Sequence, residues 1–148
     1  MINDPTEHPD YRTGLQYHEG ALRLASESRW IEALDSARQS NFLLLGCGIP
    51  QTSPIIGINY YLAAKSMFER HEWHEASILA ELSLQGLNTW EETPGKGEAL
   101  LLLAKAHMRN RKPEEAKTAV LVLLSECHPS PRYEPIGSEA EGLLRELR

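Results

Sequence analysis

The feature that most constrains the fold of this chain is a pair of alanines that recurs along the sequence at one internal distance. Each pair is twelve residues apart: Ala21 with Ala33, Ala64 with Ala76, and Ala104 with Ala116. Recurrence of a pattern every 20 to 50 residues or so is the signature of a repeat protein, in which each copy is one supersecondary unit. Three similar units packed side by side are therefore expected.

Each unit is expected to contain two amphipathic helices. A large residue stands four positions before the first alanine of each pair, and Leu24, Met67 or His107 stands three positions after it. Residues spaced by four and three share one face of a helix. An all-α fold follows from this pattern.

Short polar turns are expected between the two helices of each unit. They fall at Glu27-Ser28-Arg29, Arg70-His71-Glu72 and Asn110-Arg111-Lys112. After the last turn, Pro113 and two glutamates favour a helix start, because proline suits the first helical position and acids suit the positive end of the helix dipole. The expected helix hairpins span about 12–45, 54–87 and 95–128, after an acidic N-terminal segment, 1–11. Glycine, proline, serine and threonine mark the intervening loops.

These units resemble the tetratricopeptide repeat, whose pattern is W-x2-L-G-x2-Y, then A-x3-F, then P. The first unit offers Tyr17-x2-Gly20-Ala21-x2-Leu24 and then Ala33-x3-Ala37. The units are 43 and 40 residues apart, against about 34 in the family, so the extra length falls in the loops. The resemblance implies a right-handed superhelical array of three antiparallel helix hairpins. Its first helices would line a concave groove that binds a peptide or helix of another protein.

The groove residues are those of the first helices that helical spacing turns away from their own hairpin partner. The predicted peptide-binding set is His18, Leu22, Tyr61, Lys65, Phe68, Leu101, Lys105, Met108 and Arg109. It combines large apolar side chains with three cations, in a chain whose net charge is −6. The expected ligand therefore carries large apolar side chains and an acidic group or free carboxylate. The alternative is that the cations are merely solvated.

The three tryptophans receive two different predictions. Trp30 and Trp73 occupy matching places in two units, which favours packing between helices. Trp90 lies in the second loop and is a possible contact for a partner, because exposed tryptophans are frequent hot spots of protein interfaces. The alternative for Trp90 is that it folds back onto the helices.

A final helix is expected at 136–148, with Ser138 and Glu141 as its capping box. Its apolar stripe is Ala140, Leu143, Leu144 and Leu147. Repeat arrays need a terminal helix with one polar face, so a cap is the simplest role. A self-inhibitory or dimerising helix, and hence a possible homo-oligomer, is the alternative.

Composition and motifs exclude several classes of protein. The chain has no run of lysine and arginine, which argues against nucleic acid as a partner. Its apolar stretches are far shorter than the roughly 20 residues that cross a bilayer, and its acidic start is unlike a signal peptide, so a cytoplasmic protein without a membrane partner is expected. Cys47 and Cys127 are expected to be reduced thiols. His71 and His74 lack the further ligands that a zinc site requires.

No nucleophile elbow or phosphate-binding loop is present, so neither enzymatic activity nor a cofactor is expected. The leading hypothesis is a non-catalytic adaptor or scaffold that binds a partner's peptide or helix in its groove. Two alternatives remain. One is a small cytoplasmic chaperone of the secretion type that masks a hydrophobic client segment, and the other is a self-associating structural protein.

Overall fold

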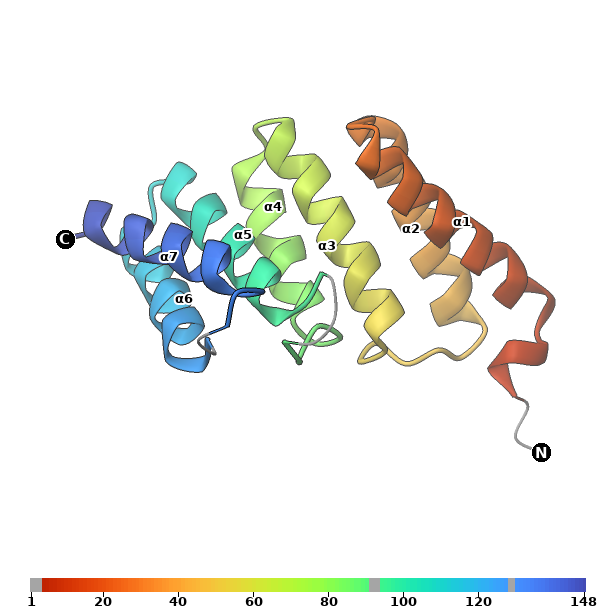
Figure 1. Ribbon diagram of the computed structural model, residues 1–148. Helices are drawn as coiled ribbons and strands as arrows, with labels where there is room; N and C mark the ends of the chain where they lie inside the picture. The colour runs from red at the N-terminus through yellow and green to blue at the C-terminus, as the bar shows by residue number, and fades with distance from the viewer. Residues whose placement is uncertain (1–3, 91–93, 128–129) are drawn as a thin grey trace.

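The computed structural model describes residues 4–90, 94–127 and 130–148, and in these residues all regular secondary structure is helical. A short 3₁₀-helix, Pro5–Glu7, precedes seven α-helices (Figure 1). These are α1 (Pro9–Ser26), α2 (Trp30–Gly46), α3 (Pro54–Glu69), α4 (Trp73–Ser83), α5 (Lys96–Arg109), α6 (Pro113–Glu126) and α7 (Glu134–Glu146). The predicted all-α class is confirmed. Residues 1–3 of the expected acidic segment and residue 128 of the expected third hairpin lie outside the described residues.

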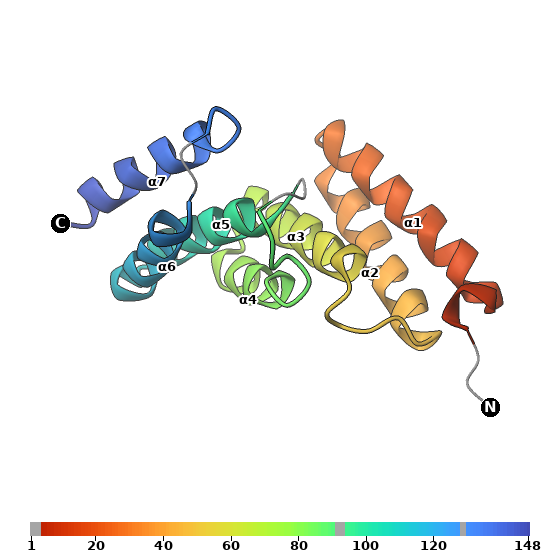
Figure 2. The same cartoon turned by 60° about the horizontal axis from the view of Figure 1, so that its bottom comes forward.

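The first six helices form a row of consecutive pairs. Helix α1 packs on α2, α3 on α4, and α5 on α6, while α2 contacts α3 and α4 contacts α5. Figures 1 and 2 show these pairs following one another from the N-terminus, with α7 at the far end of the row. The architecture is therefore repeat-like, with each pair packed against its neighbours.

The recurring alanines are fully buried in the packed helices. All of them have no exposed surface: Ala21, Ala33, Ala64, Ala76, Ala104 and Ala116. A methyl side chain lets two helices approach more closely than a bulky one would. The alanines that repeat in the sequence therefore mark positions where the helices of each unit are buried against one another.

The turns inside the three hairpins have the same backbone conformation. Ser28, His71 and Arg111 all adopt left-handed angles, with φ of 59°, 62° and 58°. In each turn the next residue donates a backbone hydrogen bond to the carbonyl five positions earlier, as in Lys112 N–H to His107 O at 2.8 Å. This bond caps the exposed carbonyls of the ending helix. The structure has turns where they were expected, but their left-handed residue could not be recognised because none is glycine or asparagine.

A second repeated position carries glycine. Gly14, Gly57 and Gly97 each precede the first alanine of their unit by seven residues, which is two helical turns. A Cβ atom at Gly57 would lie 2.9 Å from Gly86 Cα, and one at Gly97 would lie 2.5 Å from a ring carbon of Trp90. Close approach by backbone or ring therefore requires glycine here. These glycines recur at the same 43- and 40-residue spacing as the alanines, so the sequence itself carries a signal for this second repeated position.

Helix boundaries differ from expectation at both ends of the chain. Helix α1 begins at Pro9, where the His8 side chain accepts a hydrogen bond from Asp10 N–H. Helix α7 begins at Glu134, so the predicted capping box of Ser138 and Glu141 is wrong: both residues lie inside the helix. Pro135 in the first turn explains the earlier start, because its fixed φ suits that position.

Helix α7 docks its apolar stripe on the last hairpin. It contacts both α5 and α6, and Ala140 has no exposed surface. Leu143, Leu144 and Leu147 pack against the core cluster that includes Leu100 and Val120. In the described part of the chain, no helix is both long enough and apolar enough to span a membrane.

Candidate protein-binding groove

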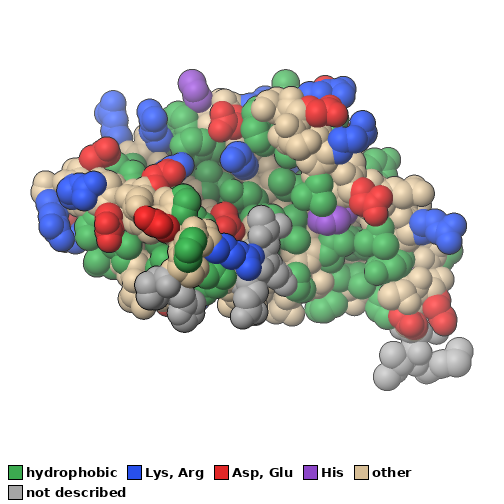
Figure 3. All heavy atoms as spheres, in the orientation of Figure 1, with side chains coloured by type: hydrophobic (Ala, Val, Ile, Leu, Met, Phe, Trp, Pro, Cys, Tyr) green, Lys and Arg blue, Asp and Glu red, His purple; other side chains and the backbone are tan. Residues whose placement is uncertain are grey.

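Two adjoining clefts lie on the surface formed by α3, α5 and α7. They share Phe68 and Lys105, and their volumes are about 220 and 390 Å³. The first is lined by Tyr61, Lys65, Phe68, Glu69, Glu98, Leu101, Leu102, Lys105 and Glu139, and the second by Phe68, Lys105, Met108, Arg109, Leu143 and Glu146. The space-filling view of this face shows apolar side chains interspersed with charged ones (Figure 3). Because the two clefts share residues, we treat them as one feature, the α3–α5 groove.

The groove contains every predicted binding residue of the second and third units. Leu101 is only 8% exposed and belongs to the core, so it forms part of the floor. The two predicted residues of the first unit line neither cleft. Leu22 is 39% exposed on α1, and His18 is half-buried with its Nδ1 2.7 Å from Asn59 Oδ1.

The three cations of the groove have different partners. Lys105 forms an ion pair with Glu139 of α7. The Lys65 ammonium lies 5.8 Å from the ring centroid of Trp30, and the Arg109 guanidinium lies 5.6 Å from that of Trp73. Such cation–π contacts are worth about 0.5–1 kcal/mol at exposed sites. Among the described residues, neither Lys65 nor Arg109 has a carboxylate partner.

The two tryptophans that hold these cations lie between successive hairpins. Each begins the second helix of one unit and meets a cation from the first helix of the next. Phe68 packs edge-on against Trp73, with ring centroids 4.9 Å apart. Both tryptophan residues are half-buried, and their packing between helices also orients the groove cations.

At the α3–α5 boundary, Tyr61 is kept protonated and Glu98 is held by a backbone hydrogen bond. Burial raises the pKa of Tyr61 to about 12, and the nearby carboxylates of Glu98 and Glu139 act in the same direction. The phenol is therefore neutral at physiological pH and keeps its proton for donation. Glu98 accepts a hydrogen bond from the backbone N–H of Gly95 at the start of α5. Its carboxylate is thus used in capping that helix.

The part that α7 takes in the groove was not predicted from the sequence. Glu139, Leu143 and Glu146 line it, and their spacing of four and three places them on one helix face. The amphipathic stripe was visible in the sequence. Which helices it docks against is decided by tertiary packing, which a single helix pattern does not encode.

The possible contact residue Trp90 lies elsewhere. Its ring lies against Gly97 and meets Tyr133 edge-on, with centroids 5.3 Å apart. The Tyr133 hydroxyl donates to the Trp90 carbonyl at 2.7 Å. The half-buried side chain thus folds back onto the helices, which was the alternative expectation for this residue.

The groove presents apolar side chains together with two cations, Lys65 and Arg109, that form no ion pair within the described residues. It brings together no group of three metal-ligating side chains, and none occurs elsewhere among the described residues. No model of a known protein family matches the sequence, and no curated protein matches it either.

Proposed function

We propose that the chain is a non-catalytic protein–protein interaction module of the tetratricopeptide type. In this proposal the three hairpins form a right-handed superhelix, and the α3–α5 groove binds a peptide or helix of a partner protein. The recurrent buried alanines, the glycines and the left-handed turn residues support the repeat assignment, because each recurs at the corresponding position of all three units.

One observation carries the binding proposal. Lys65 and Arg109 each line one of the two adjoining clefts that share Phe68, and neither has a carboxylate partner among the described residues. An aromatic face beneath each cation restrains the cation without neutralising it. A ligand segment with an acidic residue on each side of a large apolar residue would pair with both cations and cover Phe68.

Helix α7 already presents this chemistry at one edge of the groove. Its Glu139 pairs with Lys105, and Leu143 and Glu146 face the cleft that contains Arg109. The chain thus accommodates an acidic, leucine-bearing helix beside α5. A partner segment of the same character fits the remainder of the groove toward α3.

The experiment is selection from a display library of random peptides, followed by affinity measurement on the selected peptides. The expected peptides contain a leucine or aromatic residue flanked by Asp or Glu. The double variant Lys65→Glu/Arg109→Glu should lower their affinity at least tenfold, because each attraction becomes a repulsion.

The matched control is Arg12→Glu/Arg145→Glu, which makes the same change in net charge at exposed positions outside the clefts. It should retain the affinity within about twofold. Equal loss in both double variants would mean that overall charge, and not the groove, governs binding. Unchanged affinity in the groove variant would disprove the groove as the site.

Self-association is a second candidate, favoured by the apolar surface of α2. Phe42 is 75% exposed and Ile31 is 67% exposed, and their spacing of eleven residues puts them on one helix face. Light scattering tests this directly: a mass well above 16.7 kDa that returns to it in Phe42→Ser would support self-association through α2. A mass of 16.7 kDa for the unmodified chain at high concentration would reject it.

A further inference from the structure

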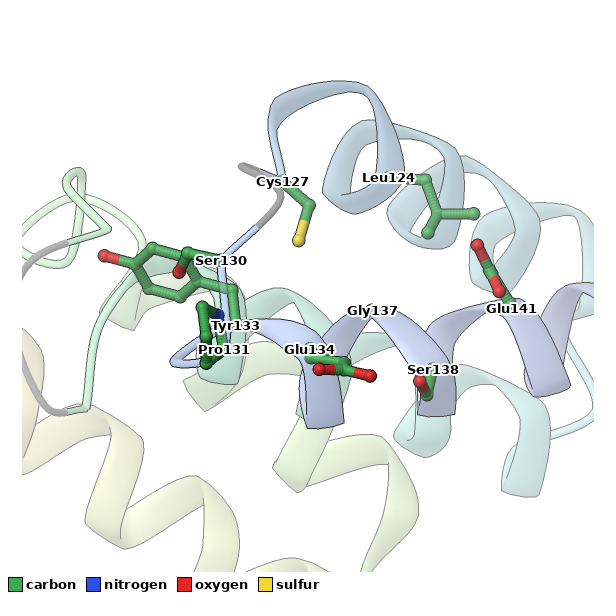
Figure 4. A pocket seen from close by; sticks show the side chains of 9 residues that line it. All are labelled: Leu124, Cys127, Ser130, Pro131, Tyr133, Glu134, Gly137, Ser138 and Glu141. Atoms are coloured by element: carbon green, nitrogen blue, oxygen red, sulfur yellow. The ribbon is translucent and has the colours of Figure 1, made fainter.

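A cleft separate from the groove lies between the end of α6 and the start of α7. Its volume is about 500 Å³, within the range of about 300–1,000 Å³ typical of ligand pockets. Leu124 and Cys127 come from the α6 side, and Tyr133 and Gly137 come from the α7 side. Figure 4 shows the Cys127 sulfur directed toward α7, with the Tyr133 ring at one end of the cleft.

This cleft corresponds, one unit later, to the space over Gly97 that the Trp90 ring fills. The second and third units are offset by 40 residues, and the same offset relates Leu84 to Leu124 and Gly97 to Gly137. Helix α7 contacts α5 and α6 just as α5 contacts α3 and α4. By position, α7 is therefore a further first helix of the row.

The occupants of the two equivalent places differ. Trp90 rests directly on Gly97, where an added Cβ would meet its ring at 2.5 Å. At the offset of 40 residues, Trp90 corresponds to Ser130, whose small side chain lines the cleft. Around Gly137 the nearest atom to an added Cβ is Cys127 Sγ, at 3.6 Å. Among the described residues, the small sulfur of Cys127, and no indole, therefore lies nearest to Gly137.

Two carboxylates border this cleft. Glu134 and Glu141 both line it and are exposed, and neither has a cationic partner among the described residues. A neutral aromatic group would satisfy only the apolar floor. A cation next to the aromatic group would also pair with the carboxylates.

We propose that the α6–α7 cleft binds a tryptophan or similar aromatic side chain of a partner protein, next to a lysine or arginine in that partner. The aromatic ring lies over Gly137 and against Tyr133, in the way that Trp90 lies over Gly97. The basic residue pairs with Glu134 or Glu141. The partner's chemistry is opposite to that proposed for the α3–α5 groove, so the two sites can be tested independently.

The test uses the full chain and the probe acetyl-Trp-Lys-amide, followed through backbone amide chemical shifts. Saturable shifts are expected at Gly137 and Tyr133. Acetyl-Ala-Lys-amide should give none, and acetyl-Trp-Glu-amide should bind at least fivefold more weakly. Glu141→Lys should weaken binding of the lysine probe, while Asp35→Lys, an equal charge change at an exposed site on α2, should not.

Filling the cleft from within is the decisive step. Ser130→Trp should abolish the chemical-shift changes caused by the probe and raise Tm by about 2–4 °C, because the new indole fills the cleft over Gly137. Gly137→Leu is the second filling variant and should also abolish the shifts. Shifts that persist in both filled variants, that map to other residues, or that never appear in the unmodified chain would each overturn the proposal.

Discussion

His18 on α1 donates a hydrogen bond to Asn59 on α3, with Nδ1 and Oδ1 2.7 Å apart, and so joins two helices that belong to different hairpins. The Asn59 amide nitrogen also donates to Ser40 Oγ at 2.8 Å and to Asn41 Oδ1 at 2.9 Å, both on α2. Asn59 has no exposed surface. One side chain therefore connects three helices at the junction of the first and second hairpins.

Asn59→Ala should lower the free energy of unfolding by about 2–3 kcal/mol. The substitution leaves buried polar groups on α2 without their partner, and each such group costs about 1–3 kcal/mol. Urea unfolding monitored by circular dichroism measures the loss. The exposed Asn88→Ala is the control and should change stability by less than about 0.5 kcal/mol. A similar small effect at Asn59 would contradict a structural role for the network.

Gly57→Ala should destabilise the protein by about 1–3 kcal/mol, although alanine is the better helix former. The added methyl would lie 2.9 Å from the Gly86 Cα and from the Leu87 nitrogen, which are backbone atoms that cannot rotate away. Gly46→Ala provides the contrast, because no atom of the described part of the chain lies within 4 Å of a Cβ there. In thermal unfolding, Tm should fall in Gly57→Ala and rise in Gly46→Ala. An unchanged Tm in Gly57→Ala would mean that α3 can shift freely.

Acid should destabilise the protein through His107. This residue occupies the position held by Leu24 and Met67 in the other units, and its Nδ1 is buried with no hydrogen-bond partner among the described residues. Burial lowers the pKa of His107 below 6.5, Lys112 acts in the same direction, and the carboxylates of Glu115 and Glu81 oppose the shift. Its contribution to stability is therefore full above pH 6.5 and is lost as pH falls toward the folded-state pKa.

His107→Leu should raise stability and reduce its loss between pH 7.5 and pH 5.5, since leucine supplies the apolar side chain that this position has in the first unit. Urea midpoints at the two pH values measure the effect. His74→Leu changes an exposed histidine and serves as the control. An unchanged pH dependence in His107→Leu would show that other groups cause the acid sensitivity.

Arg111→Gly should stabilise the protein by about 1 kcal/mol. Left-handed backbone angles cost an L-residue roughly 1–2 kcal/mol, and glycine adopts them without a steric penalty. Arg12→Gly places the same substitution inside α1, where it should destabilise by about 1 kcal/mol. Differential scanning calorimetry of the pair should show Tm moving in opposite directions. A lower Tm for Arg111→Gly would mean that its side chain stabilises the turn.

The sequence predicted the helices well because the alanine pairs and the four-and-three spacing describe local contacts that every unit repeats. Pro113 was predicted as a helix start and begins α6. The capping box at Ser138 failed because the helix begins earlier, at Glu134, with Pro135 in its first turn. Local propensity could not choose between these two starts.

The groove was predictable only in part. Helical spacing identified Lys65, Phe68, Lys105 and Arg109, since their direction follows from their own helices. The ion pair of Lys105 with Glu139 depends on the docking of α7, and the engagement of His18 depends on a buried asparagine of another hairpin. Both are long-range contacts with no periodic signature in the sequence.

The row of helices also has a kinetic consequence. Among the described helices, each one contacts only helices one or two positions away along the chain. Closing such short loops costs little chain entropy, and proteins rich in local contacts fold in microseconds to milliseconds. Any hairpin can serve as the nucleus, so refolding should begin at several points along the chain and spread outward from each.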